Sequence, residues 1–340
     1  MAETAERAQP NLLRKWGTVM QTCNPPKGHV DPVSRWLVLT RACVQPMTLT
    51  AAAVAGLLSV HTPRFNSLLF ALAATGIVLA HAANNLMNDL FDLDTGSDTA
   101  DYPRALYAPH PVLSGMITRT GLLRAAVIVN VVDLGILVVL AILRGPWVVA
   151  FALAGFVISA GYAAPPLRLK SRGLGEPGVF LVWGPLMVGG TYYAAVGRLP
   201  WHVVADTIPY ALLCTAVLMG KHLDKLPWDA PKRVGTIPVL IGEGRARTLT
   251  RAMMLGFYLS LIGLAASGAI SAWALVGLVG VTRLVPVWRV FSRPKPNGPP
   301  PEYPDYPIWP LWFTAAAFVH ARRAGALFVL GLVLAAFLPG

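Results

Sequence analysis

A short acidic segment between residues 85 and 101 carries the side chains best suited to chemistry. It holds five aspartates and two asparagines within 17 residues, directly after a long apolar run. On a helix, Asn85, Asp89 and Asp92 lie at i, i+4 and i+7, and Asn88 lies one turn before Asp92, so their oxygens should share one face. Hard oxygen ligands of this kind suit Mg²⁺, which binds through a few carboxylates together with substrate phosphates. The segment therefore predicts a magnesium site for a phosphate-bearing substrate.

The composition places this site in a membrane protein. Hydrophobic residues make up 55% of the chain and charged residues 13%, against about 25% charged residues in soluble domains. Since about 20 apolar residues cross a bilayer core, the sequence predicts nine spans. They are residues 36–60, 67–90, 122–143, 146–165, 177–196, 205–220, 252–268, 272–291 and 324–338. We expect an all-α polytopic membrane protein with about nine transmembrane helices in one bundle.

The basic residues are unevenly divided between the connections. Arg64, Arg144 and Arg198 are the only lysines or arginines in the odd-numbered connections, and the even-numbered connections hold many more. By the positive-inside rule the even-numbered connections and the N-terminus are cytoplasmic. We expect an integral protein of the cell membrane with a cytoplasmic active site. The net charge of +12 is then mainly a signal of topology, although it can also attract an anionic substrate or anionic membrane lipid. No nucleic-acid partner is expected.

The remaining segments are interpreted from their composition. Residues 1–33 are polar and are expected to form a cytoplasmic, partly disordered tail before one transmembrane domain at residues 34–340. Residues 292–310 are too rich in proline for a helix and indicate an extended cytoplasmic loop. Residues 311–320 are too short to span and are expected at the interface. The three cysteines show neither CxxC nor metal-site spacing, so no chemistry is assigned to them.

A short internal repeat favours a bundle of two halves. Residues 101–104 (DYPR) followed by 111–115 (PVLSG) are echoed by residues 229–232 (DAPK) followed by 238–242 (PVLIG). Each copy follows an even-numbered span, four spans apart. This predicts a bundle built as a pseudo-repeat of four-helix units, with two acidic loops facing one cavity.

The second acidic loop is weaker than the first. Asp224 and Asp229 are five residues apart with Pro227 between them, so we expect that they cannot share one regular helix face. Lys221 and Lys225 are interleaved with these acids, which suits a site that binds both a metal and phosphate oxygens. We expect the first motif to dominate metal affinity and the second to act mainly on charge in the transition state.

A third cytoplasmic loop adds more bases. Arg168, Lys170 and Arg172 occupy alternate positions after Tyr162. In an extended segment these three side chains would face the same way.

The residues from Asn85 to Arg104 carry a family resemblance. Their pattern, NxxNDxxDxxxGxDxxDxxR, resembles the first aspartate-rich motif of the UbiA superfamily of intramembrane prenyltransferases, and most closely the 1,4-dihydroxy-2-naphthoate prenyltransferases of menaquinone synthesis. The YxxxPxxLK and GLGE elements of residues 162–176 are similar to the loop between helices four and five of that branch. The resemblance extends from Arg41 to the last helix.

The resemblance implies a Mg²⁺-dependent transferase with an isoprenyl diphosphate donor and an aromatic quinone-precursor acceptor. One Mg²⁺ would be held by Asn85, Asn88, Asp89 and Asp92, reinforced by Asp98 or Asp101, and a second by Asp224 and Asp229. The diphosphate oxygens would be held by Lys170, Arg172 and Lys221, with Arg41 and Arg104 as further candidates. Asp89, Asp92, Asp224, Asp229 and Tyr162 are the expected catalytic residues.

Two positions depart from the family pattern. The second motif normally reads N-x-x-x-D-x-x-x-D, whereas Lys221 or His222 stands here where the amide is expected. The Arg-Pro of the family near the first span is Gln45-Pro46, with Arg41 one turn earlier. We expect these departures to affect the second metal and the identity of the acceptor.

The residue types also permit the chemistry directly. Two Mg²⁺ ions and several bases would neutralise charge as an allylic C–O bond breaks. The carbocation needs aromatic surroundings, for which Tyr162, Trp183, Tyr192 and Tyr193 are candidates, although the last three also suit ordinary packing. The acceptor ring then attacks the cation, and a carboxylate or water takes up the proton.

Other activities use similar residues. A UbiA-like terpene cyclase, or a transferase acting on a non-aromatic lipid or phosphosugar, would keep the metal site and change the acceptor. A secondary transporter would also carry acids in a pseudo-symmetric bundle, but its sites tend towards the bilayer midplane. The clustering of these acids at one surface favours a transferase.

Overall fold

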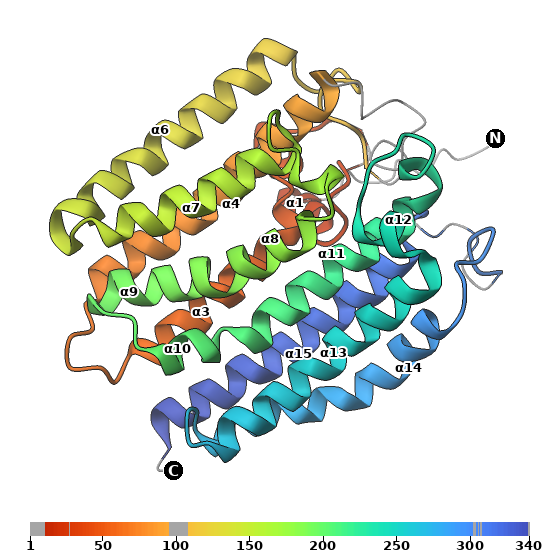
Figure 1. Cartoon of the computed structure of the whole chain (residues 1–340). Coiled ribbons are helices and arrows are strands. Elements are labelled where there is room, and N and C mark those ends of the chain that lie inside the picture. The colour runs from red at the N-terminus through yellow and green to blue at the C-terminus, as the bar shows by residue number, and fades with distance from the viewer. Residues whose placement is uncertain are drawn as a thin grey trace, which may run out of the picture.

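The computed structural model describes residues 11–26, 28–94, 108–301, 304, 306 and 308–338, and most of them are helical. Figure 1 shows the long helices side by side in one bundle. Within the described part of the chain, eight helical segments are long and apolar enough to cross a membrane. The predicted all-α polytopic membrane fold is therefore confirmed.

The longer helices are α3 (Gln45–Ser59), α4 (Ser67–Asp94), α6 (Arg119–Arg144), α7 (Trp147–Ala163), α11 (Ile208–Asp229), α13 (Glu243–Ala266), α14 (Val281–Ser292) and α15 (Trp312–Phe337). One span is composite: α8 (Gly175–Leu181), the π-helical segment η3 (Val182–Gly189) and α9 (Gly190–Val196) follow each other without a break. The shorter elements are α1 (Leu12–Thr22), α2 (Pro32–Leu39), η1 (Ala42–Val44), η2 (Leu169–Ser171), α10 (Trp201–Asp206), α12 (Ile237–Ile241) and η4 (Ala272–Gly280).

The predicted span at residues 146–165 corresponds to α7. Its 17 residues are apolar but make it shorter than the other eight segments. A straight helix needs about 17 to 25 residues to cross a bilayer core. Helix α7 therefore stands at the lower end of that range, and the predicted nine helices comprise eight long spans and this shorter one.

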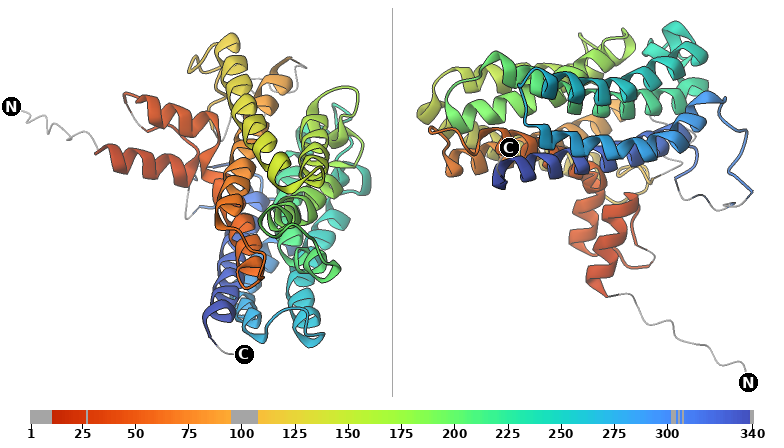
Figure 2. Two further views of the ribbon diagram at one scale, coloured as in Figure 1. Left: turned by 90° about the vertical axis from the view of Figure 1, so that its left-hand side faces the viewer. Right: turned by 90° about the horizontal axis from the view of Figure 1, so that it is seen from below.

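Two short helices precede the bundle. Figure 2 shows α1 and α2 (red) projecting sideways from it. Asn11 caps α1 by accepting from the backbone N–H of Leu13, and Asp31 caps α2 through Val33 and Ser34. Side-chain caps of this kind satisfy N–H groups that a helix start leaves unpaired. The polar tail predicted over residues 1–33 thus contains a helix, and the domain boundary at residue 34 stays a prediction.

A disulfide connects this N-terminal pair of helices to the bundle. Cys23, which ends α1, is bonded to Cys43 in η1. The two cysteines are 20 residues apart, and no spacing pattern in the sequence indicated that they pair. The bond holds the end of α1 against η1, which follows Arg41 and leads directly into α3.

Two local predictions are wrong. Helix α11 continues through Pro227 to Asp229 instead of breaking; Pro227 lies in the last turn, where one missing N–H and a local clash disturb little of the helix. Residues 311–320 do not lie at the interface as a separate segment, because α15 is one helix of 26 residues. The adjacent Arg322 and Arg323 suggested an interruption, yet both side chains are exposed beside the helix.

The main core joins the C-terminal half to α3. Its largest fully buried side chains are Tyr210, Phe257, Phe291, Phe313 and Phe328. Helices α11 and α15 approach closely at Gly220, where an added Cβ would lie 2.8 Å from the carbonyl oxygen of Phe313. A second, smaller core lies between α4 and α6 and includes Leu86 and Leu122.

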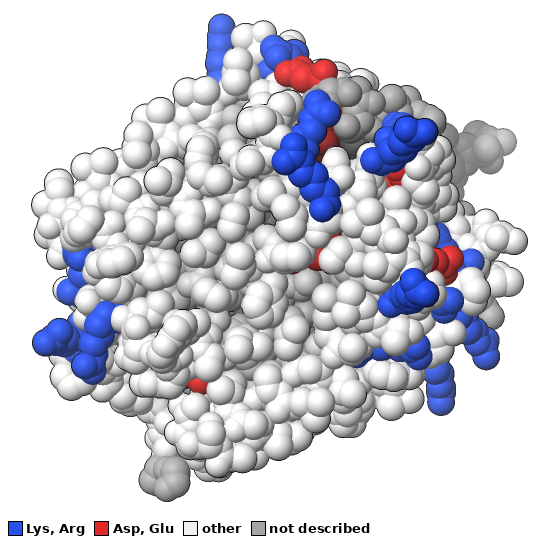
Figure 3. Space-filling model, viewed as in Figure 1, with Lys and Arg blue, Asp and Glu red and all other residues white. Residues whose placement is uncertain are grey.

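The outer surface suits a bilayer. Large apolar side chains are exposed along α6, among them Ile128, Val131 and Ile142. Figure 3 shows lysines and arginines gathered near one end of the bundle, a smaller group at the opposite end, and a largely uncharged flank between them. This distribution is typical of an integral membrane protein.

Candidate active site

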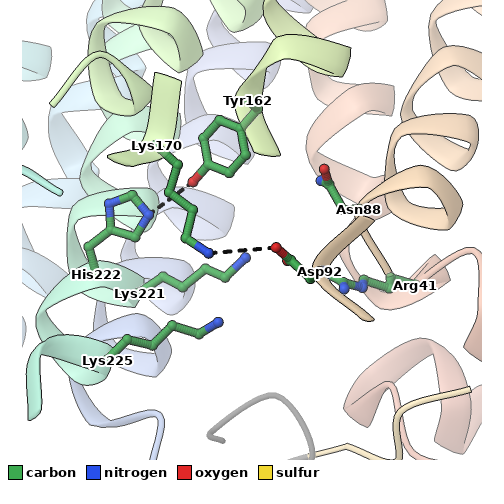
Figure 4. A pocket seen from close by; sticks show the side chains of 8 residues that line it. All are labelled: Arg41, Asn88, Asp92, Tyr162, Lys170, Lys221, His222 and Lys225. Carbon is green, nitrogen blue, oxygen red and sulfur yellow. Dashed lines mark hydrogen bonds and ion pairs between the residues drawn. The ribbon is translucent and has the colours of Figure 1, made fainter. Parts of the chain in front are cut away.

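A pocket lies between α4 and α11 at one end of the bundle. It is lined by Arg41, Asn88, Asp92, Tyr162, Lys170, Lys221, His222 and Lys225. Four of these residues are lysine or arginine, and one is a carboxylate. Figure 4 shows Arg41, Asn88 and Asp92 on one side, facing Tyr162, His222 and the three lysines. An excess of positive charge over one carboxylate and one amide suits a polyanionic ligand.

The predicted metal ligands on α4 form two pairs, of which only one lines the pocket. Asn88 and Asp92, one turn apart, line the pocket. Asn85 instead donates from Nδ2 to the carbonyl oxygen of Thr40 at 3.0 Å, and Asp89 forms an ion pair with Arg41. With 3.6 residues per turn, the four side chains spread over about 100° of the helix circumference. Only the part of this sector that carries Asn88 and Asp92 faces the pocket.

Arg41 connects the buried carboxylate of Asp89 to the pocket. It precedes η1 in the left-handed conformation, with φ at 51°, and its guanidinium both lines the pocket and pairs with Asp89, which is 0% exposed. A buried carboxylate requires such a partner because desolvation is costly. Asp89 therefore orients a pocket arginine in this structure, and its predicted role as a metal ligand stays a prediction.

One base of the third loop reaches the pocket. Lys170 lies in η2, with its Nζ 4.0 Å from Oδ1 of Asp92. Arg168, at φ 43°, turns the chain immediately before η2, at a cost of about 1–2 kcal/mol for a non-glycine residue. Because the segment is a 3₁₀ turn and not extended, the alternating arrangement predicted for the bases is wrong. Arg172 is exposed and donates to the carbonyl oxygen of Pro166 at 3.0 Å, away from the pocket lining.

Helix α11 presents lysines to the pocket. Lys221 and Lys225, one turn apart, line it together with His222. Asp224 turns to the first turn of α15, where its carboxylate accepts from the N–H of Phe313 at 3.0 Å and of Thr314 at 2.8 Å. Asp229 is buried at the end of α11 and does not belong to the pocket lining. The predicted pair of acids is thus not brought together at the pocket.

A buried chain of three polar side chains ends at the pocket. The Tyr162 hydroxyl lies 2.9 Å from Nε2 of His222, and Nδ1 of His222 lies 2.7 Å from Oε1 of Glu176. The same Glu176 oxygen accepts from the N–H of Ile237 at 3.0 Å. His222 and Glu176 are each 1% exposed. If His222 donates to the carboxylate through Nδ1, its Nε2 accepts from Tyr162, which fixes the phenol orientation.

The sequence interpretation gave Glu176 no role of its own. A glutamate at the start of an apolar span was the signal that could have identified it, because ionisable groups in membrane segments are costly unless paired or functional. His222 stands at one of the two positions where the family pattern expects an amide, and in the structure it is hydrogen-bonded to Tyr162.

Three further aromatic candidates lie outside the pocket lining. Tyr193 donates to the carbonyl oxygen of Arg144 at 3.3 Å, and the hydroxyl of Tyr192 lies 3.5 Å from that of Thr62, so both contact the odd-numbered connections at the opposite end. Trp183 packs edge-on against His81 with ring centroids 5.3 Å apart. Of the predicted aromatic set, Tyr162 alone lines the pocket.

Three predicted site residues lie outside the described part of the chain, namely Asp98, Asp101 and Arg104. Within the described part there is no group of three or more His, Cys, Asp or Glu that could hold a metal ion. The Asn88 amide oxygen and the Asp92 carboxylate still fit Mg²⁺, because this ion usually keeps waters and binds through one or two carboxylates plus substrate phosphates.

Comparison with known proteins agrees with this architecture. The family model described as the UbiA prenyltransferase family matches residues 48–303. The chain is 25% identical over 250 residues to 1,4-dihydroxy-2-naphthoate octaprenyltransferase of Bacillus subtilis (strain 168), covering 71% of this chain and 78% of that one.

Two solved structures share the fold. A UbiA homolog from Aeropyrum pernix K1 superposes with a TM-score of 0.62 at 19% identity, covering 86% of this chain and 97% of that one. A UbiA homolog from Archaeoglobus fulgidus bound to GPP and Mg²⁺ gives a TM-score of 0.55 at 16% identity, covering 86% and 99%. The family match contains every residue of the pocket lining except Arg41. This integral membrane protein therefore belongs to the UbiA prenyltransferase family.

Proposed function

We propose that this prenyltransferase moves an isoprenyl group from an allylic diphosphate to an aromatic quinone precursor, using Mg²⁺, at the cytoplasmic side of the cell membrane. The observation that carries the proposal is the pocket itself, in which Arg41, Lys170, Lys221 and Lys225 face Asn88 and Asp92. A diphosphate presents several charged oxygens at once, and guanidinium and ammonium groups bind such oxygens by charge-assisted hydrogen bonds.

The metal would be held by Asn88 and Asp92 together with the diphosphate. Bound there, Mg²⁺ would neutralise charge on the leaving group. The Archaeoglobus fulgidus homolog bound to GPP and Mg²⁺ supports this combination of ligands. Arg41 and Lys170 lie beside Asp92. They could therefore bind the diphosphate oxygens that Mg²⁺ does not bind.

The bases of the pocket carry the leaving-group step. As the allylic C–O bond breaks, negative charge grows on the diphosphate, and fixed cations aimed at these oxygens stabilise that change without reorganising. Lys170 in η2 and Lys221 and Lys225 in successive turns of α11 line the pocket, which supports this role for them. The pocket lies at the end of the bundle, so the prenyl chain would extend among the apolar side chains of the spans.

Tyr162 would act near the allylic carbon of the prenyl group, where the C–O bond breaks. Glu176 favours the tautomer of His222 in which Nε2 accepts from the Tyr162 hydroxyl. The phenol oxygen and the ring of Tyr162 then face the pocket. An aromatic ring face next to the reacting carbon can stabilise a developing cation. The acceptor ring then forms the new C–C bond, and its proton passes to a carboxylate or water. The naphthoate acceptor named for the Bacillus subtilis relative supports an aromatic acceptor.

Product analysis tests this proposal. Purified protein in lipid vesicles would receive Mg²⁺, labelled geranyl diphosphate and, in separate reactions, 1,4-dihydroxy-2-naphthoate, 4-hydroxybenzoate or no acceptor. We expect a prenylated aromatic product that forms only when an acceptor is present, with the naphthoate preferred. A cyclised hydrocarbon formed without acceptor would identify a terpene cyclase instead. The label appearing on a lipid or phosphosugar would identify a different acceptor class.

A further inference from the structure

The wall that α11 contributes to the pocket is cationic. Lys221 and Lys225 are at i and i+4, so their side chains lie on one face of the helix, and both line the pocket. Helix α11 is described from end to end, and neither of its carboxylates belongs to the pocket lining. On the opposite wall, α4 supplies the oxygens of Asn88 and Asp92. The two walls therefore offer different ligands: oxygens from α4 and ammonium groups from α11.

Asp224 is held away from the pocket by a complete set of partners. Its Oδ1 accepts from the N–H of Phe313, its Oδ2 accepts from the N–H and the hydroxyl of Thr314, and the Nζ of Lys295 lies 3.5 Å from Oδ1. Turning this carboxylate toward the pocket would leave two N–H groups at the start of α15 and one ammonium group without these bonds. Asp224 is therefore a structural residue that joins α11 to α15.

Asp229 does not by itself make a metal site with α11. It follows Lys225 by one turn and Lys221 by two turns. A divalent cation at this wall would approach two ammonium groups while gaining one carboxylate from the helix, which like-charge repulsion opposes. Mg²⁺ also demands near-octahedral oxygen coordination, and the pocket-facing side chains of α11 provide nitrogen instead.

We propose that Lys221 and Lys225 bind the diphosphate directly, taking the place of a second Mg²⁺, and that the site holds a single Mg²⁺ on its α4 side. Two ammonium groups supply the same formal charge as one divalent ion. This inference rests on the proposed function, because the ligand that the lysines bind is the diphosphate of the prenyl donor. It assigns unequal roles to the two walls: a metal bridge at Asn88 and Asp92, and direct ammonium contacts at α11.

Counting bound metal tests the inference without relying on turnover. Full-length protein in detergent would be titrated with Mn²⁺, followed by electron paramagnetic resonance, in the presence of saturating geranyl thiolodiphosphate, which is resistant to ionisation. We expect one tightly bound Mn²⁺ per chain. Two tightly bound Mn²⁺ per chain would overturn the inference, whether the second is held by α11 or by any other residues.

Two variants sharpen this result. Lys221→Asn combined with Lys225→Asp replaces the ammonium groups by oxygen ligands one turn apart, so we expect the count to rise from one Mn²⁺ to two. Lys225→Gln removes a charge without adding a carboxylate, and it should weaken binding of the thiolodiphosphate at least tenfold while the count stays at one. Arg245→Gln, at an exposed position of α13, is the matched control and should change neither quantity. Tight analogue binding by Lys225→Gln, equal to wild type, would also overturn the inference.

The outcomes separate this inference from the function on which it rests. If the wild-type protein binds the thiolodiphosphate with two Mn²⁺, the single-metal site is wrong and the proposed function stands. If it binds neither the analogue nor Mn²⁺, both are wrong. If the double variant does not fold, the wild-type count and the Lys225→Gln affinity still decide.

Discussion

The carboxylate of Asp224 is bonded to Thr314, whose backbone N–H and hydroxyl both donate to Oδ2, at 2.8 and 2.7 Å. This contact joins the last turns of α11 to the first turn of α15. Lys295 adds to it from the proline-rich loop, donating to the carbonyl oxygen of Asp224 at 3.2 Å and lying over the rings of Trp228 and Trp309. The junction fixes the rotation of α11, and that rotation turns Lys221 and Lys225 into the pocket.

Asp224→Ala should therefore destabilise the protein more than it alters metal binding. The variant loses a helix cap and leaves Lys295 without its carboxylate, for a combined cost of about 2–5 kcal/mol. Thermal unfolding in detergent would measure the loss. Thr314→Val, which removes one hydroxyl donor and keeps the backbone bonds, should cost about 1 kcal/mol. If Asp224→Asn keeps full stability yet needs far more Mg²⁺ for activity, Asp224 is a metal ligand after all.

Asp92→Asn should weaken the apparent Mg²⁺ affinity at least tenfold, because it removes the one described carboxylate that lines the pocket and Mg²⁺ sites depend on such oxygens. Titration of prenyl transfer with Mg²⁺ would show the shift. The control is Asp94→Asn, two residues along the same helix. Asp94 is bonded to Arg119 at 2.8 and 2.6 Å at the exposed end of α4, so its substitution should leave the titration within twofold. Equal shifts for both variants would contradict the assignment.

Disrupting the hydrogen-bonded series Glu176–His222–Tyr162 should reduce turnover more than it weakens binding of the diphosphate donor. Glu176→Gln weakens the acceptor that orients His222, so kcat should fall about tenfold, or about 1.4 kcal/mol, with the KM for the diphosphate little changed. Tyr162→Phe should give a loss of similar size. Because Glu176 acts on the Tyr162 hydroxyl through His222, Glu176→Gln should have little further effect once Tyr162→Phe has removed that hydroxyl, so the double variant should lose little more than Tyr162→Phe alone. Additive losses would show that Glu176 acts independently of Tyr162.

The sequence was sufficient for much of the fold and for part of the site. Runs of apolar residues predicted the spans, because their length and composition are local properties. The acidic segment that ends α4 also pointed to Asn88 and Asp92, which line the pocket, and their role as metal ligands stays a prediction. Helix rotation is different, since it depends on partners far along the chain. Asn85 and Asp89 turn toward Thr40 and Arg41, contacts that span more than forty residues.

The same limit applies to α11. In the sequence, Lys221, Asp224 and Lys225 lie within two helical turns. Their spacing does not show whether the lysines or the aspartate face the pocket. The N–H groups of Phe313 and Thr314 donate to Asp224 and hold it away from the pocket, so the lysines face the pocket instead. The 3₁₀ turn at Lys170 was likewise hidden, because it follows a left-handed Arg168 that no residue preference indicates.

The proposed orientation in the membrane has its own test. Ser171 and Arg198 are both exposed. Ser171 belongs to a connection predicted on the cytoplasmic side of the membrane, and Arg198 to one predicted on the outer side. Ser171→Cys should react with an impermeant maleimide only from the cytoplasmic side, and Arg198→Cys only from outside. Cys214 is buried. Cys23 and Cys43 would both be replaced by serine in the labelled proteins, because the disulfide between them would be exposed to reduction on the cytoplasmic side. Labelling of both positions from one side would contradict the orientation.

The central claim is that the pocket between α4 and α11 transfers an isoprenyl group from a diphosphate. The most direct measurement is the rate at which labelled geranyl diphosphate yields prenylated naphthoate in vesicles containing wild-type protein, the Asp92→Asn variant or the Asp94→Asn variant. We predict Mg²⁺-dependent product with wild type and Asp94→Asn, and a rate at least a hundredfold lower with Asp92→Asn at the same Mg²⁺ concentration. Equal rates for all three proteins, or undiminished transfer in EDTA, would contradict the account.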